Sequence, residues 1–217
     1  MTIEWIFKKC SNMSKFVKKH TSKSIYFFPN AGKMLNLPEE FLFSGPGQGG
    51  GVIQGTASEA TLVAILSAKA KAIQDYNKQS SSNNENENDV INKFKSRLVA
   101  YASAQAHSSV ERAGLLGDVQ MRLLEPDQDL SLRGDTLAKA IKEDVAKGLV
   151  PFCVVGTLGT TNCCSFDNIM EIGKVCQENG IWLHIDAAYA GSAFICPEYR
   201  FGFSYFLAED FFKKMTI

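Results

Sequence analysis

Between residues 98 and 186 the sequence alternates short apolar runs with longer stretches of helical character. Four runs are short and apolar enough to be buried strands: residues 98–103, 119–124, 150–155 and 181–186. Apolar residues three or four apart mark the stretches between them as helices. Strand–helix–strand units at this spacing favour a parallel sheet covered by helices on both faces. The sequence therefore predicts an α/β fold.

Cap residues predict where the intervening helices begin and end. The side chains that can accept hydrogen bonds from the first free backbone N–H groups are Ser108 or Ser109, Asp135 and Asp167. Gly148 and Gly180 are expected to end the second and third helices, because glycine readily adopts the left-handed conformation that closes many helices.

Asp186 ends the last apolar run and is followed by small residues. Because the run is apolar on both faces, this carboxylate falls at the carboxyl end of a buried strand, where open α/β sheets bind ligands. An unpaired buried carboxylate is costly, and no basic side chain follows closely, so a cationic group of a ligand is one expected partner. The alternative is an aspartate that caps the next turn, and spacing alone favours neither.

Two further polar residues follow other predicted strands. His107 stands between the strand at residues 98–103 and the next helix, and Thr161 lies in the loop after residues 150–155. A single histidine at such a turn is more often structural than functional. The carboxyl ends of parallel strands meet at one edge of a sheet, so we expect His107, Thr161 and Asp186 to converge there.

A glycine-rich stretch over residues 44–58 runs directly into a strong helix predicted over residues 59–76, with Ser58 as its N-cap. Free backbone N–H groups and the helix dipole converge at Ala57 and Ser58, which suits a phosphate group. The stretch matches neither the P-loop nor the dinucleotide fingerprint. Taken alone, a plain capped turn is the simpler interpretation.

Composition excludes several classes of protein. The 217 residues are 45% apolar, which is enough for one large domain or at most two small ones. Lys+Arg and Asp+Glu number 23 each, so charge gives no case for nucleic acid or a membrane surface as partner. Six cysteines without a Cys-x-x-Cys pair argue against a metal site or a disulfide framework and favour a cytoplasmic protein. We find no signal peptide and no membrane span.

Three segments differ from this core. Residues 1–30 show no clear period and are interpreted as a weakly structured or unrelated leader. A short helical segment is expected over residues 33–37, before Pro38. Residues 79–89 are rich in Ser, Asn and Glu and predict a low-complexity surface insertion.

Four segments together resemble the group II pyridoxal-phosphate-dependent amino acid decarboxylases. They are residues 49–61 (GGGVIQGTASEAT), 105–114 (QAHSSVERAG), 157–161 (TLGTT) and 182–191 (WLHIDAAYAG). The likeness runs over residues 32–200 and is strongest to the aromatic L-amino acid decarboxylases, with histidine decarboxylase a near second.

The resemblance implies a fold, a cofactor and a substrate class. Residues 32–200 would be part of the large domain of the aspartate-aminotransferase type (fold type I), with pyridoxal 5'-phosphate (PLP) as cofactor. The substrate would be an aromatic L-amino acid, which the run at residues 163–167 (CCSFD) favours, and L-histidine is the alternative. Full-length members of the family form homodimers.

The resemblance also implies four cofactor contacts outside the catalytic pair. Ala57 and Ser58 would bind the phosphate, which agrees with their place at the start of a helix. Thr161 would contact the polar edge of the cofactor, and Ala188 would pack against its ring.

His107 and Asp186 are the implied catalytic residues, and both would also bind the cofactor. His107 would stack on the pyridine ring near the reacting bonds, and Asp186 would pair with the pyridinium nitrogen. A carboxylate that keeps this nitrogen protonated makes the ring an electron sink for decarboxylation.

One family feature has no counterpart. The family attaches its cofactor to a lysine in an Asn-Pro-His-Lys-Trp motif, which does not occur in these residues. Only Lys213 and Lys214 follow Asp186, and their neighbours do not match. Without that lysine we expect a chain that keeps most of the cofactor cradle but has no decarboxylase activity alone.

The ends of the chain carry the remaining alternatives. Residues 1–31 and 201–217 do not resemble the family, so we expect a truncated product between two unrelated ends. A second hypothesis is a non-catalytic remnant that associates with, or interferes with, a full-length decarboxylase dimer through its apolar tail. A third is an erroneous gene model.

Overall fold

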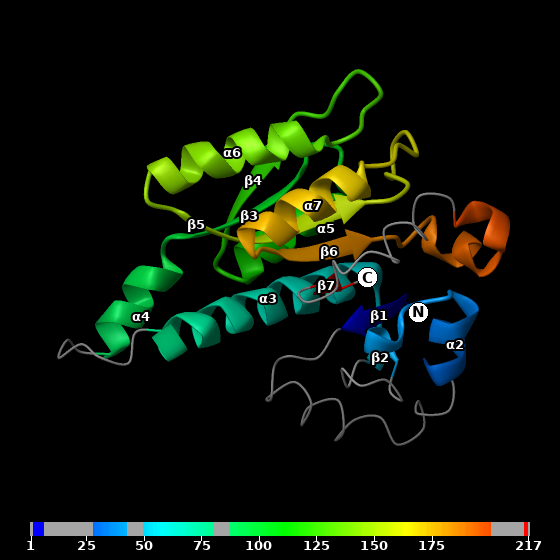
Figure 1. Cartoon of the computed structure of the whole chain (residues 1–217), viewed down its shortest axis with the longest axis horizontal. Coiled ribbons are helices and arrows are strands. Elements are labelled where there is room, and N and C mark those ends of the chain that lie inside the picture. Colours follow the sequence, from blue (N-terminus) through cyan, green and yellow to red (C-terminus); the bar gives the residue numbers. More distant parts are fainter. Residues whose placement is uncertain (1, 7–27, 43–49, 80–86, 201–214, 217) are drawn as a thin grey trace.

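The computed structural model of the chain describes residues 2–6, 28–42, 50–79, 87–200 and 215–216. Its centre is a seven-stranded sheet, drawn in Figure 1. From one edge to the other the strands are β2 (Gly50–Gln54), β1 (Thr2–Ile6), β7 (Met215–Thr216), β6 (Trp182–Asp186), β5 (Val150–Thr157), β3 (Leu98–Ser103) and β4 (Gln120–Leu124). The α/β prediction is confirmed.

The sheet is parallel except at β1. Strands β7, β6, β5, β3 and β4 pair in parallel, whereas β1 pairs antiparallel with both β2 and β7. Strand β2 therefore points the same way as β6, and the loops that follow both strands leave the same edge of the sheet.

Helices cover both faces of the sheet (Figure 1). On one face lie α3 (Ala57–Gln79), α4 (Glu87–Lys95) and α5 (Ser108–Leu116), and on the other α6 (Gly134–Ala146) and α7 (Ile169–Asn179). The remaining described helices are α2 (Phe28–Met34) and three short 3₁₀ turns, Glu39–Phe41, Gly191–Ile195 and Pro197–Tyr199.

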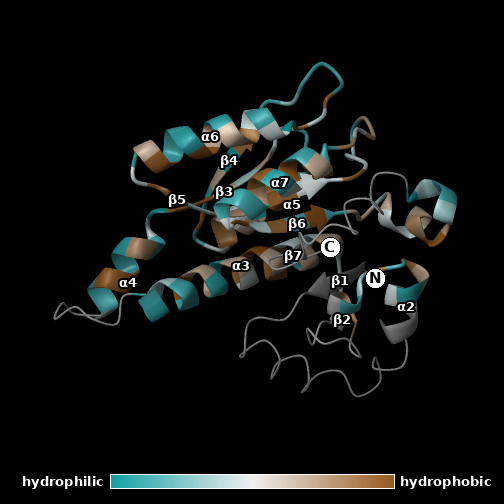
Figure 2. Cartoon of the chain, viewed as in Figure 1, coloured by the Kyte–Doolittle hydropathy of each residue, from teal (hydrophilic) through white to brown (hydrophobic). Residues whose placement is uncertain are grey.

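Two apolar cores lie on opposite sides of the sheet, and Figure 2 shows apolar strands between helices whose outer surfaces are polar. Alternation along β6 divides its side chains between these cores. Leu183 and Ile185 join the core under α6 and α7, whereas Trp182 joins the core under α3 and α5. Asp186 follows with the same parity as Trp182 and so lies on the α3/α5 face.

The strands agree well with the sequence. Strand β3 has the predicted bounds, β6 ends at Asp186 as expected, and β4 begins one residue late, at Gln120. Strand β5 runs two residues beyond its predicted end, to Thr157, because its last residues pair in parallel with the end of β6.

The predicted N-caps are wrong. His107 caps α5 in place of Ser108 or Ser109, and its ring accepts from the N–H of Ser109. At α7 the cap is Asn168 in place of Asp167, with its side chain accepting from Glu171 N–H.

The other two helix starts are also displaced. Helix α6 begins at Gly134, before the predicted cap Asp135, because the Glu171 carboxylate of α7 accepts from the N–H of Gly134. Helix α3 begins at Ala57, before Ser58, and Thr56 Oγ1 accepts from Glu59 N–H at 3.1 Å. Gly180, at φ 64°, closes α7 as predicted.

Four predictions concern segments at or beyond the limits of the described residues. The helical segment predicted at residues 33–37 is instead α2, which ends at Met34. Residues 2–6 of the leader, which was predicted to be weakly structured or unrelated, form β1. Most of the low-complexity insertion and nearly all of the tail lie outside the described residues.

Candidate active site

The loops after β3, β5 and β6 meet at one edge of the sheet. The N–H of Leu158, just past β5, donates to the carbonyl of Asp186 at the end of β6, at 2.9 Å. Gln105, after β3, approaches the Cys163 sulfur with its Oε1 at 4.0 Å. The predicted residues His107, Thr161 and Asp186 therefore belong to neighbouring loops, as the parallel topology requires.

Asp186 is half-buried as the last residue of β6. Its Oδ1 accepts from the N–H of Ala188 at 3.1 Å, so the turn that the sequence left as an alternative is present. Within the described residues, Oδ2 has no hydrogen-bond partner. The turn fixes one carboxylate oxygen and leaves the other available to a ligand.

His107 projects an exposed ring from the N-terminus of α5. Its Nδ1 lies 3.2 Å from the N–H nitrogen of Ser109 and 2.9 Å from Ser109 Oγ. Because Nδ1 accepts the backbone N–H, the neutral imidazole carries its proton on Nε2. The cap thus fixes the ring at its base and leaves the Nε2 side open.

Ala57 and Ser58 are half-buried in the first turn of α3, where backbone N–H groups have no carbonyl partner within the helix. Strand β2 points the same way as β6, so this helix start lies at the same edge as Asp186. Figure 1 shows α3 beneath β6 with its N-terminal end toward the tip of that strand. The carboxylate of Glu59 already occupies part of this helix start, where its Oε2 accepts from Gly55 N–H at 2.8 Å.

Thr161 and Ala188 are both exposed. Thr161 lies in a tight loop in which the N–H groups of Gly159 and Thr160 both donate to the carbonyl of Ser165, at 3.0 Å. Hydrogen bonds with the Ser165 and Thr160 hydroxyls hold the pKa of the Cys163 thiol below its usual value. The loop is therefore held by its own hydrogen bonds, with Thr161 at its surface.

Asp167 is a structural residue that sequence reasoning took only for a helix cap. It is 3% exposed, and its two oxygens accept from Leu132 N–H at 2.9 Å and from Thr157 N–H at 2.8 Å. Burial raises the pKa of this carboxyl to about 6. Its donors lie 35 and 10 residues away, so no local pattern in the sequence could have revealed this role.

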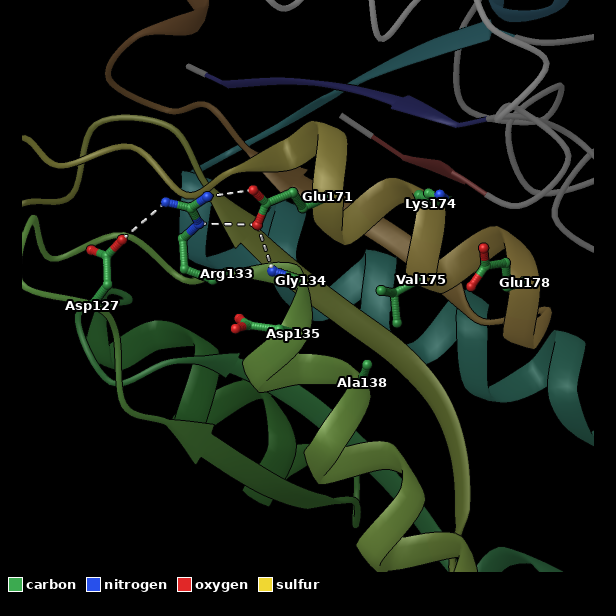
Figure 3. A pocket seen from close by; sticks show the side chains of 9 residues that line it. All are labelled: Asp127, Arg133, Gly134, Asp135, Ala138, Glu171, Lys174, Val175 and Glu178. Atoms are coloured by element: carbon green, nitrogen blue, oxygen red, sulfur yellow. Dashed lines mark hydrogen bonds and ion pairs between the residues drawn. The ribbon is translucent and has the colours of Figure 1, made fainter.

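A groove of about 630 Å³ lies elsewhere, between α6 and α7 (Figure 3). Arg133 pairs there with Glu171 and with Asp127, and none of the predicted site residues lines the groove. In the parts of the chain that the structure describes, no cluster of side chains is suited to a metal ion. No described helix is long and apolar enough to cross a membrane.

Comparison with known proteins decides the family. A family model for the pyridoxal-dependent decarboxylase conserved domain matches residues 25–207. The chain belongs to the pyridoxal-dependent decarboxylase family. The predicted resemblance and fold type are thereby confirmed, and the family match extends past residues 32–200 at both ends.

Three decarboxylase relatives illustrate the match. The aromatic-L-amino-acid decarboxylase of Manduca sexta is 59% identical over 169 residues, 78% of this chain and 32% of that protein. The histidine decarboxylase of Drosophila melanogaster is 56% identical over 170 residues, 78% of this chain and 19% of that protein. The crystal structure of Oryza sativa TDC with PLP has a TM-score of 0.71 at 35% identity, over 83% of this chain and 38% of that one.

The chain spans about a third of the length of the aromatic-L-amino-acid decarboxylases that it matches. The matched part includes every predicted cofactor residue, from Ala57 to Ala188.

Proposed function

We propose that this chain is the cofactor-binding part of a PLP-dependent decarboxylase of aromatic L-amino acids. The observation that carries the proposal is the placement of Asp186 on the same face and edge as the α3 N-terminus, with one carboxylate oxygen that no described residue occupies. A carboxylate and the N–H groups of Ala57 and Ser58 at a helix start suit the two ends of PLP, its ring nitrogen and its phosphate. The donor set therefore fits the cofactor.

Each residue has a distinct task under this proposal. Ala57 and Ser58 bind the phosphate through their backbone N–H groups, and Asp186 holds a proton on the ring nitrogen. His107 would stack on the ring and stand near the reacting bonds. Bound there, PLP supplies an electron sink for the bond that breaks when CO2 leaves.

Thr161 and Ala188 complete the cradle. The Thr161 hydroxyl contacts the polar edge of the cofactor from the loop after β5, and the methyl group of Ala188 packs against the ring. Both are exposed in the described part of the chain, so the cofactor itself would cover them.

The substrate class rests on the relatives. The aromatic-L-amino-acid decarboxylase of Manduca sexta is 59% identical to the chain, which supports an aromatic L-amino acid as substrate. A homodimer in the cytoplasm is proposed as the working form, as the resemblance implies. The histidine decarboxylase relative makes L-histidine the second candidate, to be separated by assay.

We further propose that these 217 residues hold PLP without a covalent bond and do not decarboxylate by themselves. The Asn-Pro-His-Lys-Trp motif does not occur in them, and Lys213 and Lys214 lie outside the described residues. The family's attachment lysine stands in that motif, so these residues lack the covalent anchor by which the family holds PLP.

Titration of the purified chain with PLP, followed by absorbance and by equilibrium dialysis, tests the cradle. We expect saturable binding that dialysis reverses, because no covalent bond forms. Release of CO2 from L-dopa, 5-hydroxytryptophan or L-histidine should stay at background. Absence of PLP binding would overturn the proposed cofactor site. Rapid CO2 release would overturn only the proposal that the chain is inactive, and would identify the substrate.

A further inference from the structure

Thr157 carries a hydroxyl that has no hydrogen-bond partner in the part of the chain that the structure describes. The residue is the last of β5 and is 4% exposed. Its Oγ1 is inaccessible to solvent and makes no hydrogen bond within the described residues. Buried hydroxyls are almost always paired, so an unpaired one calls for a partner that arrives later.

The sheet places this hydroxyl beside Asp186. Thr157 is the in-register partner of Asp186 across the β5–β6 pair, at a spacing of about 4.8 Å between strands. Cys153 and Val155 belong to the α3/α5 core, so alternation along β5 puts Thr157 on that face as well. Asp186 lies on the same face, and the two side chains are therefore neighbours.

The backbone of Thr157 is fixed by another group. Its N–H donates to Asp167 Oδ2 at 2.8 Å, and its carbonyl accepts from Asp167 N–H at 3.0 Å. Only rotation of the side chain can therefore bring the hydroxyl to a partner. The carboxylate of Asp186 accepts just one hydrogen bond from the described residues, so it is the neighbouring acceptor with an oxygen that none of them occupies.

We propose that Thr157 is a positioning residue that donates a hydrogen bond from Oγ1 to the carboxylate of Asp186 when PLP occupies the edge. This proposal rests on the cofactor site proposed above. A donor to the carboxylate favours its ionised form, so the proton that it shares with the ring nitrogen stays on the ring. Thr157 would also restrict rotation of the Asp186 carboxylate.

Thr157→Val and Thr157→Ser test the proposal through PLP binding to the whole chain. Valine keeps the shape and removes the hydroxyl, so the PLP dissociation constant should rise three- to tenfold. Serine restores the donor and should stay within twofold of wild type. Thr157→Ala repeats the deletion in case the second methyl of valine does not fit.

Thermal unfolding without PLP provides the readout that separates this role from a structural one. Removing an unpaired buried hydroxyl should leave the melting temperature of Thr157→Val unchanged or raised. If the Val and Ala variants both melt at a lower temperature than wild type and also bind PLP more weakly, Thr157 is a structural residue and the proposal is overturned.

A double-mutant cycle shows whether Thr157 acts through Asp186. In an Asp186→Asn background, Thr157→Val should change PLP affinity by less than twofold. An undiminished effect there would overturn the positioning role, as would wild-type affinity in Thr157→Val. If wild type itself does not bind PLP, the cofactor site and this proposal fall together, whereas wild-type binding with a silent Thr157→Val removes this proposal alone.

Discussion

Asp167 lies just before α7 and Asp186 ends β6, and their carboxylates differ in how many hydrogen bonds they accept from the described residues. Asp167 is 3% exposed and uses both oxygens to accept backbone N–H groups, from Leu132 and Thr157. Asp186 is half-buried and uses one oxygen, for the N–H of Ala188. A carboxylate whose acceptors are saturated by the fold ties segments together, whereas one left half satisfied is available to a ligand.

The two aspartates are mechanically linked through Thr157. Asp167 accepts a hydrogen bond from the backbone N–H of Thr157 at the end of β5, and Thr157 pairs in register with Asp186. The buried hydrogen bonds of Asp167 thus fix the end of β5, which lies next to the carboxylate of Asp186 on β6. Different variants should separate these contributions, because one acts on folding and the other on binding.

The largest effect is expected from Asp167→Ala. It leaves the N–H groups of Leu132 and Thr157 without acceptors in the core, so the free energy of unfolding should fall by about 2–4 kcal/mol. Urea denaturation followed by circular dichroism measures the change. Asp129→Ala, at an exposed carboxylate in the loop before α6, is the control and should change stability by less than about 0.5 kcal/mol. A similarly small change in Asp167→Ala would remove the contrast between the two aspartates.

Asp186→Asn should do the reverse, weakening PLP while sparing the fold. Asparagine can still accept from Ala188 N–H, but it carries no charge to pair with the ring nitrogen. A hydrogen bond to a charged group is worth about 1.5–3 kcal/mol, so the PLP dissociation constant should rise about 10- to 100-fold.

Asp118→Asn is the matched control for that binding measurement. Asp118 lies in the turn before β4, at the opposite edge of the sheet, with φ 49°, a conformation that asparagine tolerates. Equal losses of affinity in the two variants would mean that PLP responds to net charge and not to Asp186.

The pH dependence of stability should carry the signature of Asp167. Burial raises the pKa of its carboxyl to about 6, above the value of about 3.9 expected in the unfolded chain. Between these values the folded chain binds a proton that the unfolded chain releases, so this contribution to stability falls as pH rises. Wild type relative to Asp167→Ala should be about 1 kcal/mol more stable at pH 5 than at pH 7, measured by denaturation at both pH values. A stability difference between the two proteins that is the same at pH 5 and pH 7 would mean that burial does not raise the pKa of Asp167.

The sequence predicted the sheet better than the helix ends. Hydrophobic pattern and composition predicted β3 and the end of β6 correctly, because a buried strand is a run of apolar residues that can be identified from the local sequence. The caps were wrong where tertiary partners decide them, as at Gly134, whose N–H is satisfied by Glu171 from another helix. Asp186 was located from its strand, but the unpaired hydroxyl of Thr157 depends on register between strands and could not be read locally.

The smallest expected effect concerns the other end of the cradle. Glu59 Oε2 accepts from Gly55 N–H at the start of α3, where the phosphate of PLP is proposed to bind. Glu59→Gln keeps an acceptor for this N–H and removes a negative charge, so PLP should bind about two- to fivefold more tightly at low salt, a gain that 0.5 M salt should erase. Glu178→Gln, at an exposed position of α7, is the matched control and should be silent in the same titration. Weaker PLP binding in Glu59→Gln would mean that the carboxylate contributes more by holding the loop at Gly55 than it costs by repelling the phosphate. Glu59 would then act mainly on the fold, as Asp167 does.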